Sequence, residues 1–159
     1  MTGGTTTFTP REVKRQKVEV HIAGTGFRID NDHTVSLLFA RRSLERELFP
    51  GKLEGCGGQL LEDETFAQGV TRHFKQELNI DVQPLEDIHN FYAIKYGSYI
   101  IPGIHFLCKV IHMSQPTLIR HSEILWMKEA EFRNRPADDF TGTLQQDVIH
   151  LLDQLRLQN

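Results

Sequence analysis

The residues most suited to chemistry lie in the stretch from 55 to 80, which reads GCGGQLLEDETFAQGVTRHFKQELNI. Its closely spaced glycines allow the backbone to approach a ligand or a metal ion, because glycine has no side chain to hold a partner off. Further along, His73 and Glu77 are four residues apart, so their side chains meet if the segment is helical. An imidazole beside a carboxylate is suited to binding a metal ion or to transferring a proton.

A helix over 65–78 is predicted to position these groups. Thr65 is a good N-cap, Gln68 follows at the capping-box spacing, and apolar residues recur every four positions. Acidic residues at 62–64 precede the helix start, where its partial positive charge stabilises carboxylates. Asn79 then stands where helices often turn left-handed, a conformation that asparagine tolerates. At about 100° per residue, the polar face of this helix comprises Gly69, Arg72, His73, Gln76 and Glu77.

Strands are predicted on both sides of that helix. Alternating apolar residues indicate strands over 17–29 and 34–42, joined by a turn, and the punctuated segment 43–55 is interpreted as a loop. Two strand-like runs follow within 87–113. The Pro-Gly pair at 102–103 predicts a bulge or bend in the second run.

The C-terminal part contains a short predicted strand over 123–127 and then a polar segment. From about 143 to 155, leucines and a valine recur on one stripe, which predicts an amphipathic helix packed on the sheet. The resulting order of two strands, a helix, three strands and a helix is typical of an α/β fold in which helices cover a mixed sheet.

Length and composition limit the function classes. The chain has 159 residues, which fits one domain, and we expect a flexible arm over 1–14 followed by a single domain over 15–159. The net charge is −3, so long nucleic acid is not expected as a partner. Neither a membrane span nor a secretory signal is apparent. The two cysteines are far apart in sequence, which favours reduced thiols and a cytoplasmic location. A homodimer is plausible by base rate.

The stretch from 58 to 80 resembles the signature of the Nudix hydrolase superfamily. That signature runs Gly, five residues, Glu, seven residues, then Arg-Glu-apolar-any-Glu-Glu-any-Gly-apolar. The positions that match are Gly58, Glu64, Arg72, Phe74, Glu77 and Ile80. Three positions differ, since His73 and Gln76 replace glutamates and Asn79 replaces the glycine. The resemblance extends over roughly 17–157 and is most specific between 51 and 80.

This resemblance implies a Nudix-type α/β/α sandwich with a mixed central sheet. It also implies hydrolysis of the diphosphate linkage of a nucleoside diphosphate derivative, or of a similar small diphosphate, with Mg²⁺ or Mn²⁺. Carried over to this chain, Glu77 and the carbonyl of Gly57 are implied metal ligands, and Glu123 is a later acidic ligand or base. Arg72 is implied to pair with Glu64. His73 is a further candidate ligand or general base.

The replaced carboxylates leave other interpretations open. Mg²⁺ prefers oxygen ligands with full negative charge, so the substitutions at 73 and 76 predict a weaker or different metal site. A catalytically weak or inactive Nudix-fold binding module is therefore the main alternative, with His73 and Gln76 as ordinary helix-surface residues. A metal-using isomerase of the same fold is a second alternative. It is disfavoured because the characteristic Cys and His clusters of such enzymes are missing.

Substrate contacts are expected from outside the motif. Arg41 ends a predicted strand beside the expected cleft and is a candidate for binding a phosphate, as is its neighbour Arg42. Trp126 is a candidate for stacking on a base, as is Tyr92. Each has a simpler interpretation, a solvated arginine or a core aromatic residue. The remaining histidines show no metal-ligand spacing and are interpreted as structural or exposed.

Overall fold

A computed structural model of the protein describes residues 4–9 and 16–158. The arm predicted over 1–14 thus falls partly outside the described residues, and residues 4–9 form neither helix nor strand. The regular elements are β1 (His21–Ile29), β2 (Val35–Arg42), β3 (Leu53–Glu54), β4 (Cys56–Gln59), α1 (Phe66–Leu78), β5 (Ile80–Tyr96), β6 (Tyr99–Met113), β7 (His121–Lys128), α2 (Glu129–Asn134), the 3-10 helix η1 (Ala137–Asp139) and α3 (Leu144–Leu157).

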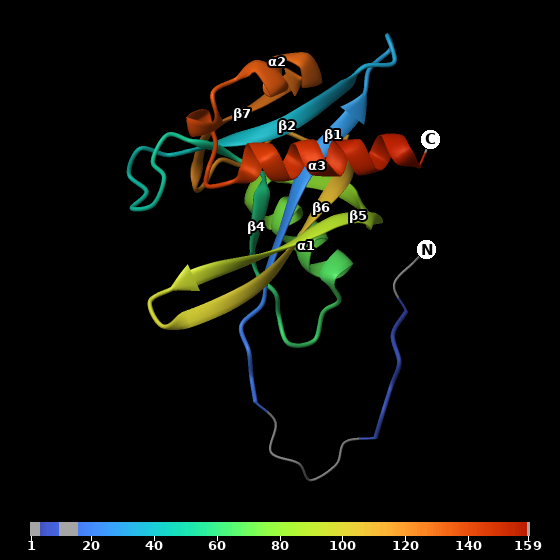
Figure 1. The fold of residues 1–159 in the computed structure, drawn as a ribbon, viewed down its shortest axis with the longest axis vertical. Coiled ribbons are helices and arrows are strands. Elements are labelled where there is room, and N and C mark those ends of the chain that lie inside the picture. The colour runs from blue at the N-terminus through green and yellow to red at the C-terminus, as the bar shows by residue number, and fades with distance from the viewer. Residues whose placement is uncertain (1–3, 10–15, 159) are drawn as a thin grey trace.

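A seven-stranded mixed sheet forms the centre of the fold (Figure 1). Its main order is β3-β2-β1-β6-β5, while β4 also pairs with β1 and β7 also pairs with β2. β1 and β6 run parallel, whereas β1 runs antiparallel to β2 and to β4. The mixed sheet predicted from the sequence is therefore confirmed.

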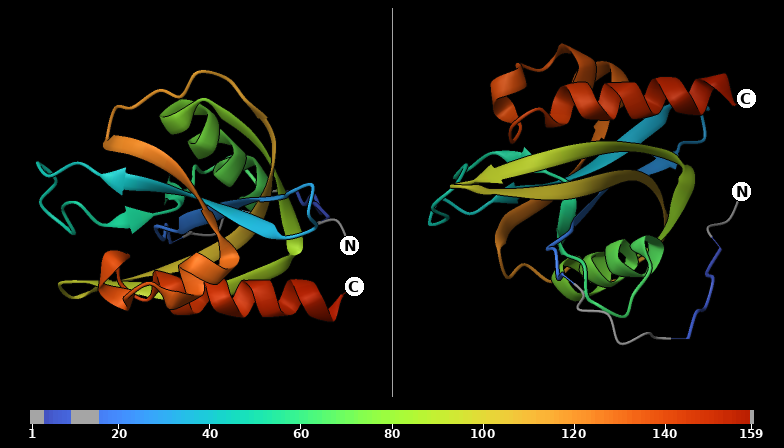
Figure 2. Two further views of the ribbon diagram at one scale, coloured as in Figure 1. Left: turned by 90° about the horizontal axis from the view of Figure 1, so that it is seen from above. Right: turned by 60° about the horizontal axis from the view of Figure 1, so that its bottom comes forward.

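Helices cover both faces of this sheet, with α1 on one side and α3 on the other (Figure 2). Two apolar cores result, because side chains alternate between the faces of each strand. The core under α1 includes Val70, Phe74 and Leu78, and the core under α3 includes Val148, Leu151 and Leu152. Each fully buried side chain of this size contributes about 1.5–3 kcal/mol through the hydrophobic effect. The α/β/α sandwich expected from the sequence is confirmed.

Helix α1 begins and ends as its sequence predicts. The backbone N–H of Gln68 donates to Thr65 Oγ1 at 3.2 Å, and the Thr65 N–H donates to Gln68 Oε1 at 2.9 Å. Asn79 ends the helix with φ 57°, in the left-handed region. A side-chain N-cap contributes about 1 kcal/mol, so these local residues fix the start of the helix and hence the rotation of its polar face.

Two sequence predictions are wrong in detail. Residues 56–59, for which the sequence predicted no strand, form strand β4 and pair with β1. A Cβ at Gly57 would lie 2.2 Å from the carbonyl oxygen of Ile22, so glycine permits this close pairing. The bulge expected at 102–103 is absent, because both residues keep register with β5. An added Cβ at Gly103 would meet the ring of Tyr92 at 2.4 Å, so this glycine makes room for a cross-strand side chain instead.

Other elements were not anticipated. Strand β5 begins at Ile80, directly after α1, and register shifts interrupt its pairing with β6 between Asp81 and Val82 and between Pro84 and His89. The polar segment after β7 contains helix α2. Within the described ranges, no helix has the length and apolar character needed to cross a membrane.

Candidate functional site

A cleft with a volume of about 560 Å³ lies beside β4. Gly57 and Gly58 of β4 line it, together with Cys56 and with Glu77 from the last turn of α1. The cleft therefore lies where the sequence places its strongest motif. A volume in this range accommodates a small-molecule ligand of nucleotide size.

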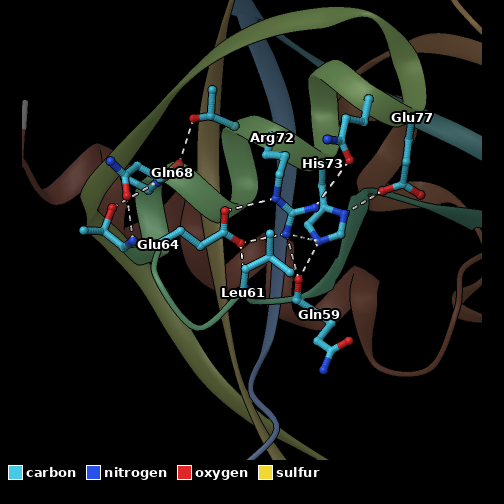
Figure 3. Close-up of polar contacts among 11 residues, drawn as sticks. Gln59, Leu61, Glu64, Gln68, Arg72, His73 and Glu77 are labelled. Atoms are coloured by element: carbon cyan, nitrogen blue, oxygen red, sulfur yellow. Dashed lines mark hydrogen bonds and ion pairs between the residues drawn. The ribbon is translucent and has the colours of Figure 1, made fainter.

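Arg72 joins α1 to the segment that precedes it (Figure 3). Its Nε and Nη2 donate to the two carboxylate oxygens of Glu64 at 3.0 and 2.7 Å, and Nη2 also donates to the Gln59 carbonyl at 3.0 Å. The Leu61 N–H donates to Glu64 Oε1 at 2.8 Å. The hydrogen bond from Arg72 lowers the pKa of Glu64. This pairing agrees with the expectation from the motif, and it holds the end of β4 against the helix.

His73 lies between Glu77 of α1 and Gln59 at the end of β4 (Figure 3). Its Nδ1 lies 3.0 Å from Glu77 Oε2, and its Nε2 lies 3.0 Å from the carbonyl oxygen of Gln59. An added Cβ at Gly58 would lie 2.5 Å from the imidazole Cε1, so the ring packs directly on this glycine. Each ring nitrogen thus lies within hydrogen-bond distance of an oxygen atom, and Arg72 Nη2 also lies 3.4 Å from Nε2. The His73 side chain therefore bridges a helix carboxylate and a backbone carbonyl.

Glu77 is the charged residue of α1 that lines the cleft. Burial raises its pKa, but hydrogen bonds from His73 and from the Cys56 thiol lower it, and the net effect is a lowered pKa. The Cys56 Sγ donates to Glu77 Oε2 at 3.4 Å. Burial, and then the negative charge of Glu77, raise the pKa of Cys56 well above its ordinary value. The cleft thus contains an ionised carboxylate next to a protonated thiol.

These donors do not fit a magnesium ion. Mg²⁺ demands several oxygen ligands in octahedral geometry. Here the nearest side chains to Glu77 are an imidazole and a thiol, and the same carboxylate oxygen, Oε2, accepts from both. The other nitrogen of the imidazole contacts the Gln59 carbonyl oxygen. Between residues 16 and 158, and over 4–9, no group of three His, Cys, Asp or Glu side chains has a metal-binding arrangement.

Three further predicted site residues lie away from this cleft. Arg41 Nε donates to Glu123 Oε1 at 2.7 Å, and the pair sits on β2 and β7, outside the residues that line the cleft. The guanidinium of Arg28 lies 4.0 Å from the ring centroid of Trp126, which packs against the core under α1. The structure therefore does not bring Arg41, Glu123 or Trp126 together with Glu77.

The neighbour of Arg41 enters the cleft instead, because successive strand residues face opposite ways and β2 has a register shift between 41 and 42. Arg42 Nη1 contacts the two carboxylate oxygens of Glu54 at 3.0 and 3.1 Å. His121 Nε2 contacts the same carboxylate at 2.7 Å, and its buried Nδ1 has no hydrogen-bond partner among the described residues. The sequence interpretation named Arg42 as a candidate and treated His121 as structural or exposed.

The cleft lining also includes His21, Tyr92 and His105, whose contacts spacing alone did not reveal. His21 Nδ1 is hydrogen-bonded to the Tyr92 hydroxyl, and His105 Nε2 is 2.8 Å from Thr25 Oγ1. Burial, followed by the charge of His21, lowers the pKa of His105 to about 4. These residues come from three different strands, so only strand pairing brings them together.

Comparisons with known proteins identify the fold. No protein-family model and no curated protein sequence matches the chain. Among solved structures, the C. elegans Ap4A hydrolase binary complex is 17% identical, with a TM-score of 0.64 over 86% of this chain and 99% of that one. A NUDIX hydrolase from Nitrosomonas europaea is 18% identical, with a TM-score of 0.67 over 87% and 90%. The NUDIX domain of Shewanella oneidensis NrtR complexed with ADP ribose is 14% identical, with a TM-score of 0.65 over 89% and 90%.

These similarities show that the chain has the Nudix fold, as the motif resemblance predicts. Each of the three covers most of both chains. A shared fold at this level of identity does not carry over a reaction or a substrate, so function must be argued from the residues of the cleft.

Proposed function

We propose that this chain is a Nudix-fold binding protein whose cleft receives a small nucleoside diphosphate derivative, or a related diphosphate, and hydrolyses it weakly or not at all. The observation that carries the proposal is the position of His73. Its ring lies between the Glu77 carboxylate and the Gln59 carbonyl, at 3.0 Å from each. The motif implies a helix carboxylate and a backbone carbonyl as cation ligands. Here a carboxylate and a carbonyl of these kinds are joined by the His73 side chain.

The other polar groups of α1 support the same conclusion. Arg72 donates hydrogen bonds to the Glu64 carboxylate and to the Gln59 carbonyl, and its Nη1 also contacts Gln76 Oε1 at 3.4 Å. This leaves Glu77 as the carboxylate of α1 that lines the cleft. Similarity to a domain solved with ADP ribose and to an Ap4A hydrolase makes a nucleotide derivative the first ligand class to test.

A second candidate function is hydrolysis of such a diphosphate with Mg²⁺ or Mn²⁺ as cofactor. It is favoured by the retained Arg72–Glu64 pair and by the position of Glu77 in the cleft. The donor set described above does not fit Mg²⁺, so we place this function second. Manganese tolerates imidazole better than magnesium does and is the cation to test first.

Turnover and binding assays separate the two functions. Purified protein is incubated with ADP-ribose, Ap4A and a panel of other nucleoside diphosphate derivatives, with Mg²⁺, with Mn²⁺ and with EDTA. The binding function predicts measurable affinity for at least one compound and metal-dependent product formation that is absent or far below enzymatic rates. Metal-dependent release of a nucleoside monophosphate at enzymatic rates would favour hydrolysis instead.

The cytoplasmic location and the homodimer stay predictions. Cys56 and Cys108 are both free and buried, which agrees with the reduced thiols expected from their spacing. Light scattering on the purified protein tests the dimer, and fractionation of the source cells tests the compartment. The division into an arm over 1–14 and a single domain over 15–159 is tested by limited proteolysis.

A further inference from the structure

The cleft carries a cluster of three arginines that the motif does not include. Arg42, Arg46 and Arg120 all line it. Arg42 is paired with Glu54, so its charge is largely offset. Arg46 and Arg120 have no carboxylate within ion-pair distance in the part of the chain that the structure describes. The cluster therefore has surplus positive charge on the cleft wall.

Backbone contacts hold these arginines close together. The carbonyl of Arg120 accepts from the Ser43 N–H at 3.4 Å and from Arg46 Nη1 at 3.5 Å. Burial, and then the positive charge of Arg42, lower the pKa of Arg46, and Arg120 adds to this effect, while the carboxylates of Glu54 and Glu77 oppose it. Like charges at this proximity repel one another, and a bound anion relieves that repulsion. Guanidinium groups are especially suited to phosphate, because they donate several hydrogen bonds in one plane.

The loop between β2 and β3, which contains Arg46, projects from the end of β2 (Figure 1). An aromatic side chain, Phe49, lies in this loop. Phe49 lines the cleft, and the residue is 45% exposed. Its φ is 50°, a left-handed conformation that phenylalanine rarely adopts. The loop is held on both sides, since Arg42 Nε donates to the Leu48 carbonyl at 2.9 Å and the Gly51 N–H donates to the Arg42 carbonyl at 3.0 Å. Such strain persists where the surrounding structure imposes it, and it is often found at ligand sites.

We propose that Arg46 and Arg120 bind the phosphate groups of the ligand without a metal ion, and that Phe49 stacks on its base. This inference rests on the proposed binding function and specifies it. The ligand class is a nucleoside phosphate. Its phosphate groups contact Arg46 in the loop after β2 and Arg120 just before β7, and its base contacts Phe49 in the same loop as Arg46. Stacking on a base needs only an exposed ring face, which Phe49 provides.

The test measures binding by calorimetry in EDTA, with inorganic pyrophosphate, ADP and ADP-ribose as probes. The site variant is Arg46→Gln/Arg120→Gln, and its charge-matched control is Lys95→Gln/Lys109→Gln, which removes two exposed positive charges from β5 and β6. A third variant, Arg46→Lys/Arg120→Lys, keeps the charge. Circular dichroism melting curves confirm that each variant is folded.

We expect the site variant to lose at least about tenfold in affinity for pyrophosphate and ADP, while the control changes little and the lysine variant is intermediate. Phe49→Ala should lower the affinity for ADP by about fivefold or more and leave the affinity for pyrophosphate unchanged. Pyrophosphate binding by the folded site variant with wild-type affinity would overturn the role of the arginines. An equal effect of Phe49→Ala on both probes would overturn the stacking role.

Failure of this subsite and failure of the proposed function give different results. If the wild-type protein binds ADP-ribose and the site variant binds it equally well, the subsite is wrong and the binding function stands. If the wild-type protein binds pyrophosphate through Arg46 and Arg120 but no nucleoside derivative, the phosphate subsite stands, whereas the stacking role and the proposed function are wrong. If no probe binds, both are wrong.

Discussion

The imidazole of His73 and the carboxylate of Glu77 form a hydrogen bond of 3.0 Å within the last turns of α1, at the edge of a cleft. The other nitrogen of the ring contacts the Gln59 carbonyl at the same distance. A residue that departs from the Nudix signature thus joins the helix to the glycine-rich strand, as the matching residue Arg72 also does.

Restoring the two missing carboxylates should create a metal site. The variant His73→Glu/Gln76→Glu places three glutamates on one face of α1, and oxygen ligands with full charge are those that Mg²⁺ and Mn²⁺ prefer. We expect Mn²⁺ affinity, measured by electron paramagnetic resonance, to rise at least about tenfold over the wild type. Lys75→Glu is the control, because it adds negative charge on another face of the helix. Equal affinities for the restored variant and the wild type would place the implied cation site elsewhere.

The packing of His73 on Gly58 predicts a rescue by double mutation. Gly58→Ala puts a methyl group 2.5 Å from the imidazole Cε1, so overpacking should destabilise the protein by about 1–3 kcal/mol. His73→Ala removes the ring and leaves room for the methyl group. In urea unfolding, Gly58→Ala should therefore cost much less in the His73→Ala background than in the wild type. Additive losses would show that the ring does not pack on this glycine.

The Arg72–Glu64 pair should matter for stability. Glu64 is only 10% exposed at its side chain, so Arg72→Met leaves a largely buried carboxylate without its cation. We expect a loss of about 2–3 kcal/mol in the free energy of unfolding, measured with urea. Lys17→Met is the matched control, because the Lys17–Glu62 pair is 83% and 78% exposed and such pairs contribute little. Similar losses in the two variants would contradict this difference.

His105 should make stability fall with acidification. Its pKa is lowered by burial, and next by His21, to about 4, whereas the unfolded chain has the ordinary value of 6.5. Below pH 6.5 the unfolded state binds a proton that the folded state does not. The contribution of His105 is therefore complete above pH 6.5 and is lost as the pH falls towards 4, by up to about 3 kcal/mol.

Unfolding midpoints at neutral and acidic pH test this dependence. His105→Gln should lose correspondingly less stability than the wild type between the two conditions, since glutamine does not titrate. His150→Gln, at an exposed position on α3, should follow the wild type. A wild-type pH profile in the His105→Gln variant would show that another group is responsible.

The sequence predicted what depends on local pattern. The capping box of Thr65 and Gln68, the left-handed Asn79 and the spacing of Glu64 from Arg72 are all read along one segment, and the structure has them. Residues brought together by strand pairing were not predicted. Arg120 meets the loop after β2 only because β7 pairs with β2, and no short-range signal marks that contact.

The choice between Arg41 and Arg42 shows the same limit at a finer scale. Both end one strand, and the sequence favoured Arg41 as the phosphate ligand. Successive side chains of a strand face opposite ways, so only one of the two enters the cleft, and which one does so depends on how the strand is placed in the sheet. The stacking role expected for Trp126 stays a prediction, and in the structure the Arg28 guanidinium lies 4.0 Å from its ring centroid.

The decisive measurement is calorimetric titration of ADP-ribose into the wild-type protein, first in EDTA and then with excess Mn²⁺, with product analysis afterwards. Because the His73 side chain bridges Glu77 and the Gln59 carbonyl, and arginines line the same cleft, we predict the same dissociation constant in both conditions and essentially intact ADP-ribose at the end. Binding that requires Mn²⁺, followed by release of AMP, would contradict this prediction and identify a metal-dependent hydrolase.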